Sequence, residues 1–408
     1  QGGYEFENGT HVSMDDAGNV YVAGWASIWD RGDDDIVVIK YSSSGVKQWD
    51  YMYDAGLHSS LGYDHPFGVG TDAAGNVYVA GKARFQRSGL QDYDLVTIKL
   101  NATGAEQWRR YYDWTGGSSD HGDDVAVDMA VDADGNVWVL GTSDGEYVTV
   151  KYNAAGTRQW VRRYEGGHAG ANSDARALAI DRQGNVVVTG ASQGAVYHGY
   201  DYVTIKYDGA GTQQWVARYD NNDQQTSFDP ADVAVDAAGN VAVTGSFDAG
   251  NGDFDIATVY YTSGGTEVWD DTWSGSGFAG VFDDHGTGVA FDSQGNLIAV
   301  GWTSQNVTAD DYLTIKYSPA GVRLWTRTYN EVPGVAGTGD SLDWAYDVGV
   351  DGAGRITVVG QLDVDYQGIA TQPTYGVITY DPEGNILDVR HWDAEPGFPL
   401  LDEALEVA

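Results

Sequence analysis

Four oxygen-bearing side chains follow one another closely in the acidic segment DAGNGDFD. They are Asp248, Asn251, Asp253 and Asp255. Carboxylate and amide oxygens at this alternating spacing are able to wrap around a single Ca²⁺ ion, which prefers oxygen ligands. The segment therefore predicts a calcium site. The alternative that the sequence leaves open is an acidic loop solvated by water.

Three histidines that each follow an aspartate are the candidate catalytic groups: His65, His121 and His285. An imidazole can exchange a proton near neutral pH or bind a metal, so an Asp-His pair is typical of acid–base or metal chemistry. No serine lies in a G-x-S-x-G elbow, which disfavours a serine triad. A carboxylate pair suited to glycoside hydrolysis would occur by chance among 60 acidic residues and is not singled out.

These residues belong to a chain built from one repeated phrase. The first copy, DDAGNVYVAG, ends at Gly24, and the other copies end at Gly81, Gly141, Gly190, Gly245, Gly301 and Gly360. Successive copies are 49 to 60 residues apart. The seven copies fill the chain, which indicates one repetitive domain without a linker.

Each repeat predicts four short strands, a to d. Strand a is an apolar alternation before the D-x-x-G-N turn, and strand b is the NVYVAG segment. Strand c resembles YVTIKY, and strand d contains a tryptophan in six units. Seven units of four antiparallel strands predict an all-β, seven-bladed β-propeller, whereas a β-solenoid would need shorter repeats. The predicted single domain spans 1–408, with blades at 7–54, 64–113, 124–166, 174–220, 229–274, 284–330 and 343–393 and a tail at 394–408.

The residues GNVYVAG, YVTIKY, QW and RY resemble the SBBP-type β-propeller repeats of secreted bacterial proteins. The resemblance covers almost the whole chain and implies the same fold, but no shared catalytic motif. Blade seven departs most, with Arg355 for the turn asparagine, Thr379 for the strand-c lysine and Leu387 for the strand-d tryptophan. We expect this blade to mark the closure of the ring, with segments 2–6 and 398–408 sealing the seam.

The connections of the repeat assign the two faces of the ring. The a–b and c–d turns are tight, whereas the b–c and d–a connections vary and open on the opposite face, where binding is expected. An acidic residue precedes strand a in every unit: Glu7, Asp64, Asp124, Asp174, Asp229, Asp284 and Asp343. These acids are expected to ring the channel mouth. They either accept backbone N–H bonds or bind a cation.

Residues that break the sevenfold symmetry are the candidate ligand contacts. Trp302, Trp344 and Trp25 belong to blades six, seven and one, which are contiguous in a closed ring, so they predict one aromatic patch suited to sugar rings. Asp64, Asp284 and Asp343 complete the predicted ligand-binding set. His65 and His285 belong to blades two and six, which are not neighbours, so we do not expect them to act as one pair.

Charge and composition exclude several functions. The 22 Lys and Arg against 60 Asp and Glu give a net charge of -38, which disfavours nucleic acid and anionic membranes as partners. The absence of cysteine excludes disulfides and thiolate sites, and no apolar run predicts a membrane span. The start at Gln1 is compatible with a removed signal peptide.

The sequence thus predicts a secreted, bacterial, non-catalytic binding or scaffold propeller for extracellular carbohydrate or protein ligands. The alternative is a polysaccharide lyase or hydrolase with its cleft on the variable-loop face.

Overall fold

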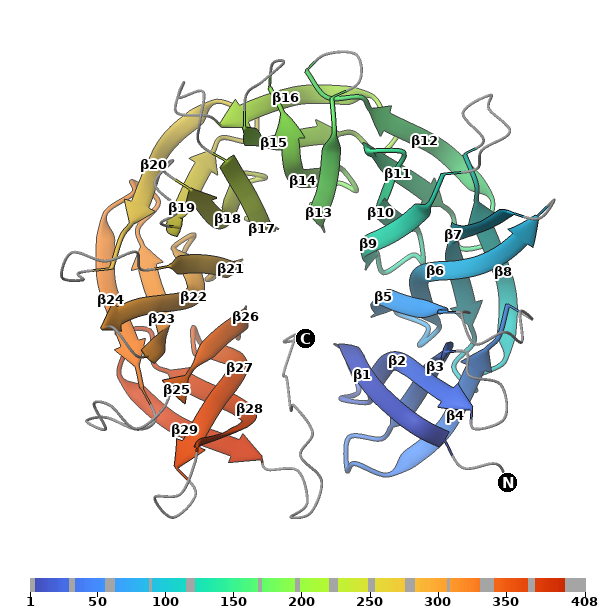
Figure 1. The fold of residues 1–408 in the computed structure, drawn as a ribbon, viewed down its shortest axis with the longest axis horizontal. Helices are drawn as coiled ribbons and strands as arrows, with labels where there is room; N and C mark the ends of the chain where they lie inside the picture. Colours follow the sequence, from blue (N-terminus) through green and yellow to red (C-terminus); the bar gives the residue numbers. More distant parts are fainter. Residues whose placement is uncertain are drawn as a thin grey trace.

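The computed structural model describes residues 4–28, 34–55, 63–87, 90–114, 122–167, 171–194, 199–219, 227–248, 254–275, 283–306, 309–330, 341–365 and 371–392. These residues form seven four-stranded antiparallel sheets arranged around one centre (Figure 1). The predicted all-β, seven-bladed β-propeller is confirmed. Strands a to d are consecutive in every blade, so no described blade combines strands from both ends of the chain.

The first three blades occupy the N-terminal part of the chain. Blade one contains β1 (Tyr4–Met14), β2 (Val20–Ile28), β3 (Asp34–Tyr41) and β4 (Lys47–Tyr53). Blade two contains β5 (His65–Thr71), β6 (Val77–Arg87), β7 (Leu90–Leu100) and β8 (Glu106–Tyr112). Blade three contains β9 (Asp124–Val131), β10 (Val137–Ser143), β11 (Glu146–Tyr152) and β12 (Arg158–Tyr164).

The remaining four blades follow the same order. Blade four contains β13 (Ser173–Ile180), β14 (Val186–Gln193), β15 (Tyr200–Tyr207) and β16 (Gln213–Tyr219). Blade five contains β17 (Ser227–Val235), β18 (Val241–Asp248), β19 (Phe254–Tyr261) and β20 (Glu267–Trp273). Blade six contains β21 (Asp284–Phe291), β22 (Leu297–Asn306), β23 (Ala309–Tyr317) and β24 (Arg323–Tyr329), with the short β25 (Ser341–Leu342) parallel to β23. Blade seven contains β26 (Trp344–Val350), β27 (Ile356–Asp365), β28 (Thr371–Tyr380) and β29 (Ile386–Trp392).

The D-x-x-G-N phrase forms the tight turn between strands a and b. In blade six, Asp292 Oδ1 accepts the backbone N–H of Asn296 at 2.9 Å, and Asp292 Oδ2 accepts the Asn296 side-chain amide at 2.8 Å. Gly295 has a φ of +80°, a conformation that strains residues with a side chain. The aspartate, glycine and asparagine of the repeat are therefore turn-forming residues and not a calcium loop.

The strand-c lysine neutralises this turn aspartate. Lys316 Nζ lies 2.9 Å from Asp292 Oδ2, and both side chains are only 4% exposed. In blade seven Thr379 replaces the lysine, and Arg355, at the asparagine position, donates its Nε–H to Asp351 Oδ2 at 2.6 Å. The two departures of blade seven are thus complementary, because the arginine supplies the charge that the missing lysine would supply.

The strand-d tryptophans join neighbouring blades. Each of the six donates its indole N–H to a carbonyl in the c–d turn of the next blade, at 3.0 to 3.2 Å: Trp49, Trp108, Trp160, Trp215, Trp269 and Trp325. The buried apolar residues of the described chain also gather between blades, in six clusters that join blades one to two through six to seven. The core of the protein therefore lies in the junctions and not inside single blades.

Candidate functional site

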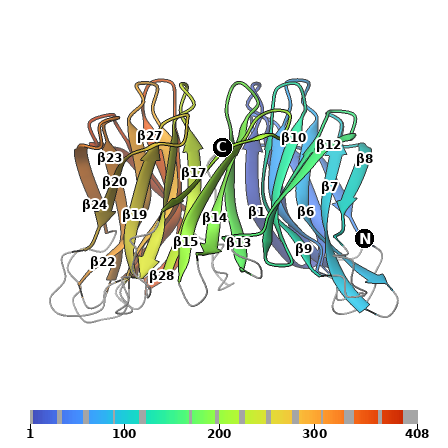
Figure 2. The same cartoon turned by 90° about the horizontal axis from the view of Figure 1, so that it is seen from above.

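The variable connections leave one edge of the ring. Figure 2 shows the tight a–b and c–d turns gathered along the opposite edge. Strands b therefore end, and strands a begin, at the edge that carries the long connections. We call this edge the loop face. All predicted ligand-binding residues lie at or near it, because they occupy the ends of strands b or the starts of strands a.

Four aromatic rings form a continuous stack on the loop face of blades five to seven. The centroids of Phe254 and His285 are 5.1 Å apart, those of His285 and Trp302 are 4.3 Å apart, and those of Trp302 and Trp344 are 5.8 Å apart. All four side chains are half-buried. We call these four residues the aromatic row.

Hydrogen bonds fix the orientation of the aromatic row. The Trp344 indole N–H donates to Asp310 Oδ2 at 2.8 Å, and Ser246 Oγ lies 2.9 Å from His285 Nδ1. Burial lowers the pKa of His285, although the charges of Asp283 and Asp310 oppose this shift. The imidazole is therefore neutral at neutral pH, and the row presents uncharged ring surface.

Trp25 does not belong to this row. Its ring stacks on His65 with centroids 5.1 Å apart, at the junction of blades one and two. His65 Nε2 also lies 3.0 Å from Asp34 Oδ2, and the edge of Tyr63 approaches the imidazole at 6.0 Å. The three-tryptophan patch expected from the sequence thus divides into two aromatic groups.

Cationic side chains stand beside His65 on blade two. Lys82 pairs with His65 in the register of β5 and β6, and its Nζ lies 4.9 Å from the centre of the Tyr93 ring. The Arg84 guanidinium lies 5.7 Å from the same ring. Burial lowers the pKa of Lys82, and it also lowers that of His65 against the hydrogen bond to Asp34. His65, with Asp34 behind it, is consequently a neutral imidazole able to accept a proton.

The predicted acidic ring is largely built into the framework. Asp64, Asp284 and Asp343 are at most 4% exposed. Their carboxylates accept backbone N–H bonds, for example from Ala55 to Asp64 at 2.9 Å and from Asp363 to Asp343 at 2.8 Å. These bonds favour the structural interpretation of the ring over direct ligand contact. The three acids therefore hold the backbone of the loop face in place through these hydrogen bonds.

Blades four and five depart from that arrangement. Arg176 Nη1 lies 2.9 Å from Asp174 Oδ2, and Arg176 Nε lies 2.8 Å from Asp229 Oδ1. These three residues, with Tyr200 and Phe228, help to line a hollow of about 400 Å³. Sequence reasoning missed Arg176. The signal was an arginine in an inner strand, at the bulge between Ala175 and Ala177, where no other blade has a charged residue.

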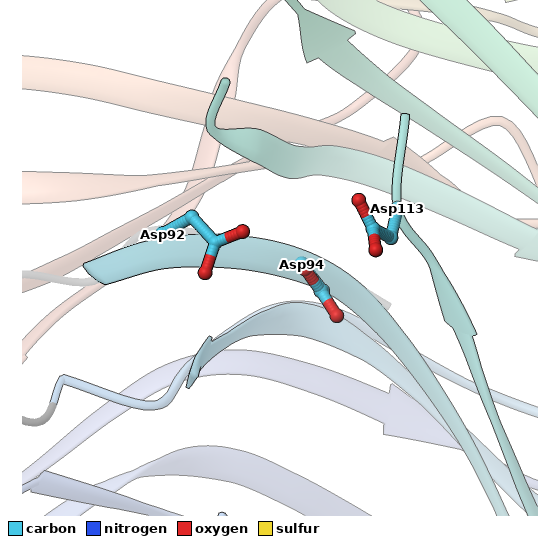
Figure 3. Close-up of side chains that lie close together, drawn as sticks. All are labelled: Asp92, Asp94 and Asp113. Carbon is cyan, nitrogen blue, oxygen red and sulfur yellow. The ribbon is translucent and has the colours of Figure 1, made fainter. Parts of the chain in front are cut away.

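Three carboxylates converge at the junction of β7 and β8 in blade two. Oxygen atoms of Asp92, Asp94 and Asp113 all lie within 4.8 Å of one another (Figure 3). Asp92 and Asp94 are buried, and Asp113 is exposed. This acidic group could hold a metal ion, since carboxylate oxygens suit Ca²⁺.

A comparison between blades shows which strand-c acids have a cationic partner in strand d. In blades three and four the strand-c acids Glu146 and Asp201 form ion pairs with Arg163 and Arg218 of strand d. Tyr111 occupies that arginine position in blade two. Blades one, five and six also have a neutral residue there, so this pattern alone does not single out blade two.

Part of the predicted site lies outside the described residues. Asp248 ends β18 and Asp255 lies in β19, but Asn251 and Asp253 are not among the described residues. His121 is also outside them. His65 and His285 belong to different blades, and each has its own hydrogen-bond partner, Asp34 and Ser246 respectively.

Comparisons with known proteins reveal similarity of fold. No protein-family model and no curated protein matches the chain. The polysaccharide lyase Uly1 is similar with a TM-score of 0.51 and 9% identity, over 92% of this chain and 90% of that one. A Lactobacillus plantarum protein matches with a TM-score of 0.48 and 15% identity, over 79% and 84%. The periplasmic gluconolactonase of Pseudomonas aeruginosa matches with 0.43 and 12%, over 94% and 84%.

The similar structures differ in what their names say they do, and all are under 25% identical. The similarity to Uly1, at 9% identity, therefore concerns the fold alone. No helix in the described part of the chain is long and apolar enough to cross a membrane. The seven four-stranded antiparallel sheets make the chain a seven-bladed β-propeller.

Proposed function

We propose that this chain is a secreted, SBBP-type binding propeller that holds an extracellular carbohydrate on its loop face. The observation that supports the proposal is the aromatic row, four half-buried rings in successive contact across blades five to seven, of which Trp344 is tilted against Trp302. Flat aromatic surfaces with polar groups at their edge suit sugars, whose rings present apolar C–H faces and hydroxyl rims. Asp310 and Ser246 lie at that edge.

The negative charge of the chain disfavours anionic polysaccharides as ligands. A net charge of -38 repels polyanions at long range, so we expect a neutral glycan at the aromatic row. An extracellular protein remains the alternative ligand of a scaffold propeller. Its surface would be recognised over the wider loop face and not by the aromatic row alone.

Removing Trp302 or Trp344 is expected to weaken binding of neutral oligosaccharides strongly. Loss of a central aromatic contact costs about 2 kcal/mol or more, which corresponds to roughly 30-fold in Kd. Calorimetric titration of Trp302→Ala and Trp344→Ala with gluco-, manno- and xylo-oligosaccharides measures this loss. The control is Trp114→Ala, which removes a 42% exposed tryptophan on blade two.

If all three variants bind glycan as well as the wild type does, the aromatic row is not the binding site, and the site lies elsewhere on the loop face. Absence of binding to any oligosaccharide would leave protein ligands as the better proposal.

A specific constellation favours the alternative function, a polysaccharide-active enzyme. His65, hydrogen-bonded to Asp34, stands beside Lys82 and near Tyr63. A lyase needs a base, a proton donor and a cation near the carboxylate of its substrate, and these side chains offer all three. Release of unsaturated chains from a uronic-acid oligosaccharide, or of shortened chains from the neutral ones, abolished in His65→Ala, would establish this function in place of non-catalytic binding.

We propose that the protein binds Ca²⁺, and the bound ion is expected to raise the melting temperature of the protein. A ligand at 100 times its Kd stabilises the folded state by about 2.7 kcal/mol. Melting in millimolar CaCl₂ and in EDTA measures the shift, with MgCl₂ as the control for ionic strength. Asp94→Asn should abolish the shift if Asp92, Asp94 and Asp113 bind the ion. Asp255→Asn should abolish it if segment 248–255 does, and an unchanged melt excludes both.

A further inference from the structure

One face of blade one is less covered than the same face of every other blade. Val20, Val22, Ile39 and Tyr41 are half-buried on β2 and β3. The residues at the same four positions of blades two to seven are at most 3% exposed. The residue types are as apolar in blade one as elsewhere, so the sequence provides a surface that suits burial.

This face is the side of blade one that turns away from blade two. Its counterpart on blade two, which includes Val79 and Ile98, packs against Tyr21 and Ile36 of blade one. By the same repeat, the face with Val22 and Ile39 turns toward blade seven. It surrounds a hollow of about 320 Å³, lined also by Val37, Gly24 and Lys47. We call this face the seam face.

Blade seven lacks the residues that cover this face at other junctions. At the other junctions a strand-d tryptophan covers the c–d turn glycine of the next blade, so that a Cβ on Gly384 would meet the Trp325 ring at 2.7 Å. In blade one, a Cβ on Gly45 would meet nothing within 4 Å. The residue of blade seven in the tryptophan position is Leu387, which is 55% exposed.

Blade seven also has a polar side chain at its inner contact position. Thr357 stands where the other six blades have Tyr21, Tyr78, Trp138, Val187, Ala242 and Ile298, all 0% exposed. Within the described ranges, the buried clusters join consecutive blades from one to seven, and none of them joins blade seven to blade one. The junction between blades seven and one therefore has room for another segment.

We propose that the C-terminal segment 393–408 of the same chain packs on the seam face. It begins directly after Trp392, the last residue of β29 in blade seven. Its 16 residues include five large apolar side chains: Phe398, Leu400, Leu401, Leu405 and Val407. Extended, 16 residues span up to about 50 Å, against roughly 15 Å across four paired strands. The segment is thus long enough to cross the whole seam.

Two physical arguments favour this segment over a second copy of the chain. A tethered segment acts at an effective concentration in the millimolar range, without an encounter between molecules. Two copies that meet at their seam faces would bring two chains of charge -38 together, and the repulsion opposes such a dimer. The segment carries five acidic residues of its own, but it is already part of the chain, so its packing brings no second charge of -38 to the surface.

A chain ending at Trp392 tests the proposal. Its melting midpoint is expected to fall by about 5 °C, and a peptide of residues 393–408 added in excess should restore it, whereas a scrambled peptide should not. A fall that the peptide does not reverse, or no fall, contradicts packing of the segment on the seam face. A dimer in sedimentation that dissociates when Ile39 is replaced would instead assign the face to a second copy.

A second measurement does not depend on the truncated chain. Ile39→Ala should lower the midpoint clearly in the wild type but much less in a Leu400→Ala, Leu401→Ala background, because Ile39 then has no covering partner to lose. The matched control is Ile98→Ala, the same position in blade two, which is 1% exposed. Ile98→Ala should cost the same in both backgrounds. Equal costs of Ile39→Ala in both backgrounds would overturn the proposal.

Discussion

Replacing Lys316 by threonine is expected to lower the free energy of unfolding by about 3–5 kcal/mol. The Lys316 ammonium lies 2.9 Å from Asp292 Oδ2, with both side chains 4% exposed. Burial alone would raise the pKa of Asp292, but hydrogen bonds from Asn296 and Lys316 lower it. Without the lysine, the carboxylate would remain buried with its charge unbalanced. Urea unfolding of the wild type and Lys316→Thr measures the loss.

Blade seven supplies the rescue experiment. There, threonine stands in place of the lysine, and Arg355 binds the turn aspartate Asp351 in its stead. Adding Asn296→Arg to Lys316→Thr copies this arrangement into blade six and should recover a large part of the lost stability. The single variant Asn296→Arg is the control. If the double variant is no more stable than Lys316→Thr, then charge balance is not what the lysine provides.

Arg355 and Thr379 of blade seven show what the repeat pattern predicts and what it does not. The sequence alone indicates seven blades, because turn glycines, alternating strands and strand-d tryptophans recur and are set by local physics. It also marks blade seven as the exception. It does not reveal that Arg355 compensates for the missing lysine, because the two positions are 24 residues apart and meet only through the pairing of β27 with β28.

The candidate site was less predictable than the fold. Trp302 and Trp344 occupy positions that face each other between neighbouring blades, so the repeat places them together. Trp25 occupies the same position as Trp302, and the same rule makes it face His65 of blade two. To predict the contact between Trp25 and His65, one must know toward which neighbouring blade each side chain of strand b points. Asp92, Asp94 and Asp113 converge where β7 pairs with β8, and the sequence pattern does not show which side chains of the two strands meet.

The protein is expected to be more stable at pH 5 than at pH 8, because two half-buried carboxyls of the inner strands, Asp128 and Asp232, have raised pKa values. Asp128 accepts the N–H of Leu178 in blade four at 2.7 Å, and Asp232 accepts that of Val289 in blade six at 2.8 Å. Burial raises the pKa of Asp128 to about 7 and raises that of Asp232 well above its ordinary value. The charge of Asp347 contributes to both shifts.

The sign of the effect follows from proton linkage. A carboxyl whose pKa is higher in the folded state stabilises that state when protonated, and this stability is lost as the pH rises through the folded pKa. For Asp128 the difference between pH 5 and pH 8 is about 2.5 kcal/mol. His11 opposes it, because burial lowers its pKa to about 4 and its contribution, about 2 kcal/mol, is lost as the pH falls from 6.5. Asp232 adds to Asp128, and so do Asp124 and Asp284, because burial raises the pKa of each to about 6. The lowered pKa values of His65 and His285 act in the same direction as that of His11, and we expect a net gain at pH 5.

Urea unfolding between pH 5 and pH 8 in high NaCl measures this gain, since salt screens the general repulsion of a chain with charge -38. Asp128→Asn and Asp232→Asn should each flatten the dependence on pH, whatever they cost in absolute stability, because each removes one titrating group. Asp16→Asn, at an exposed turn position, is the control and should leave the dependence unchanged. If both variants keep the wild-type slope, the response to pH arises from the net charge of the surface and not from these two carboxyls.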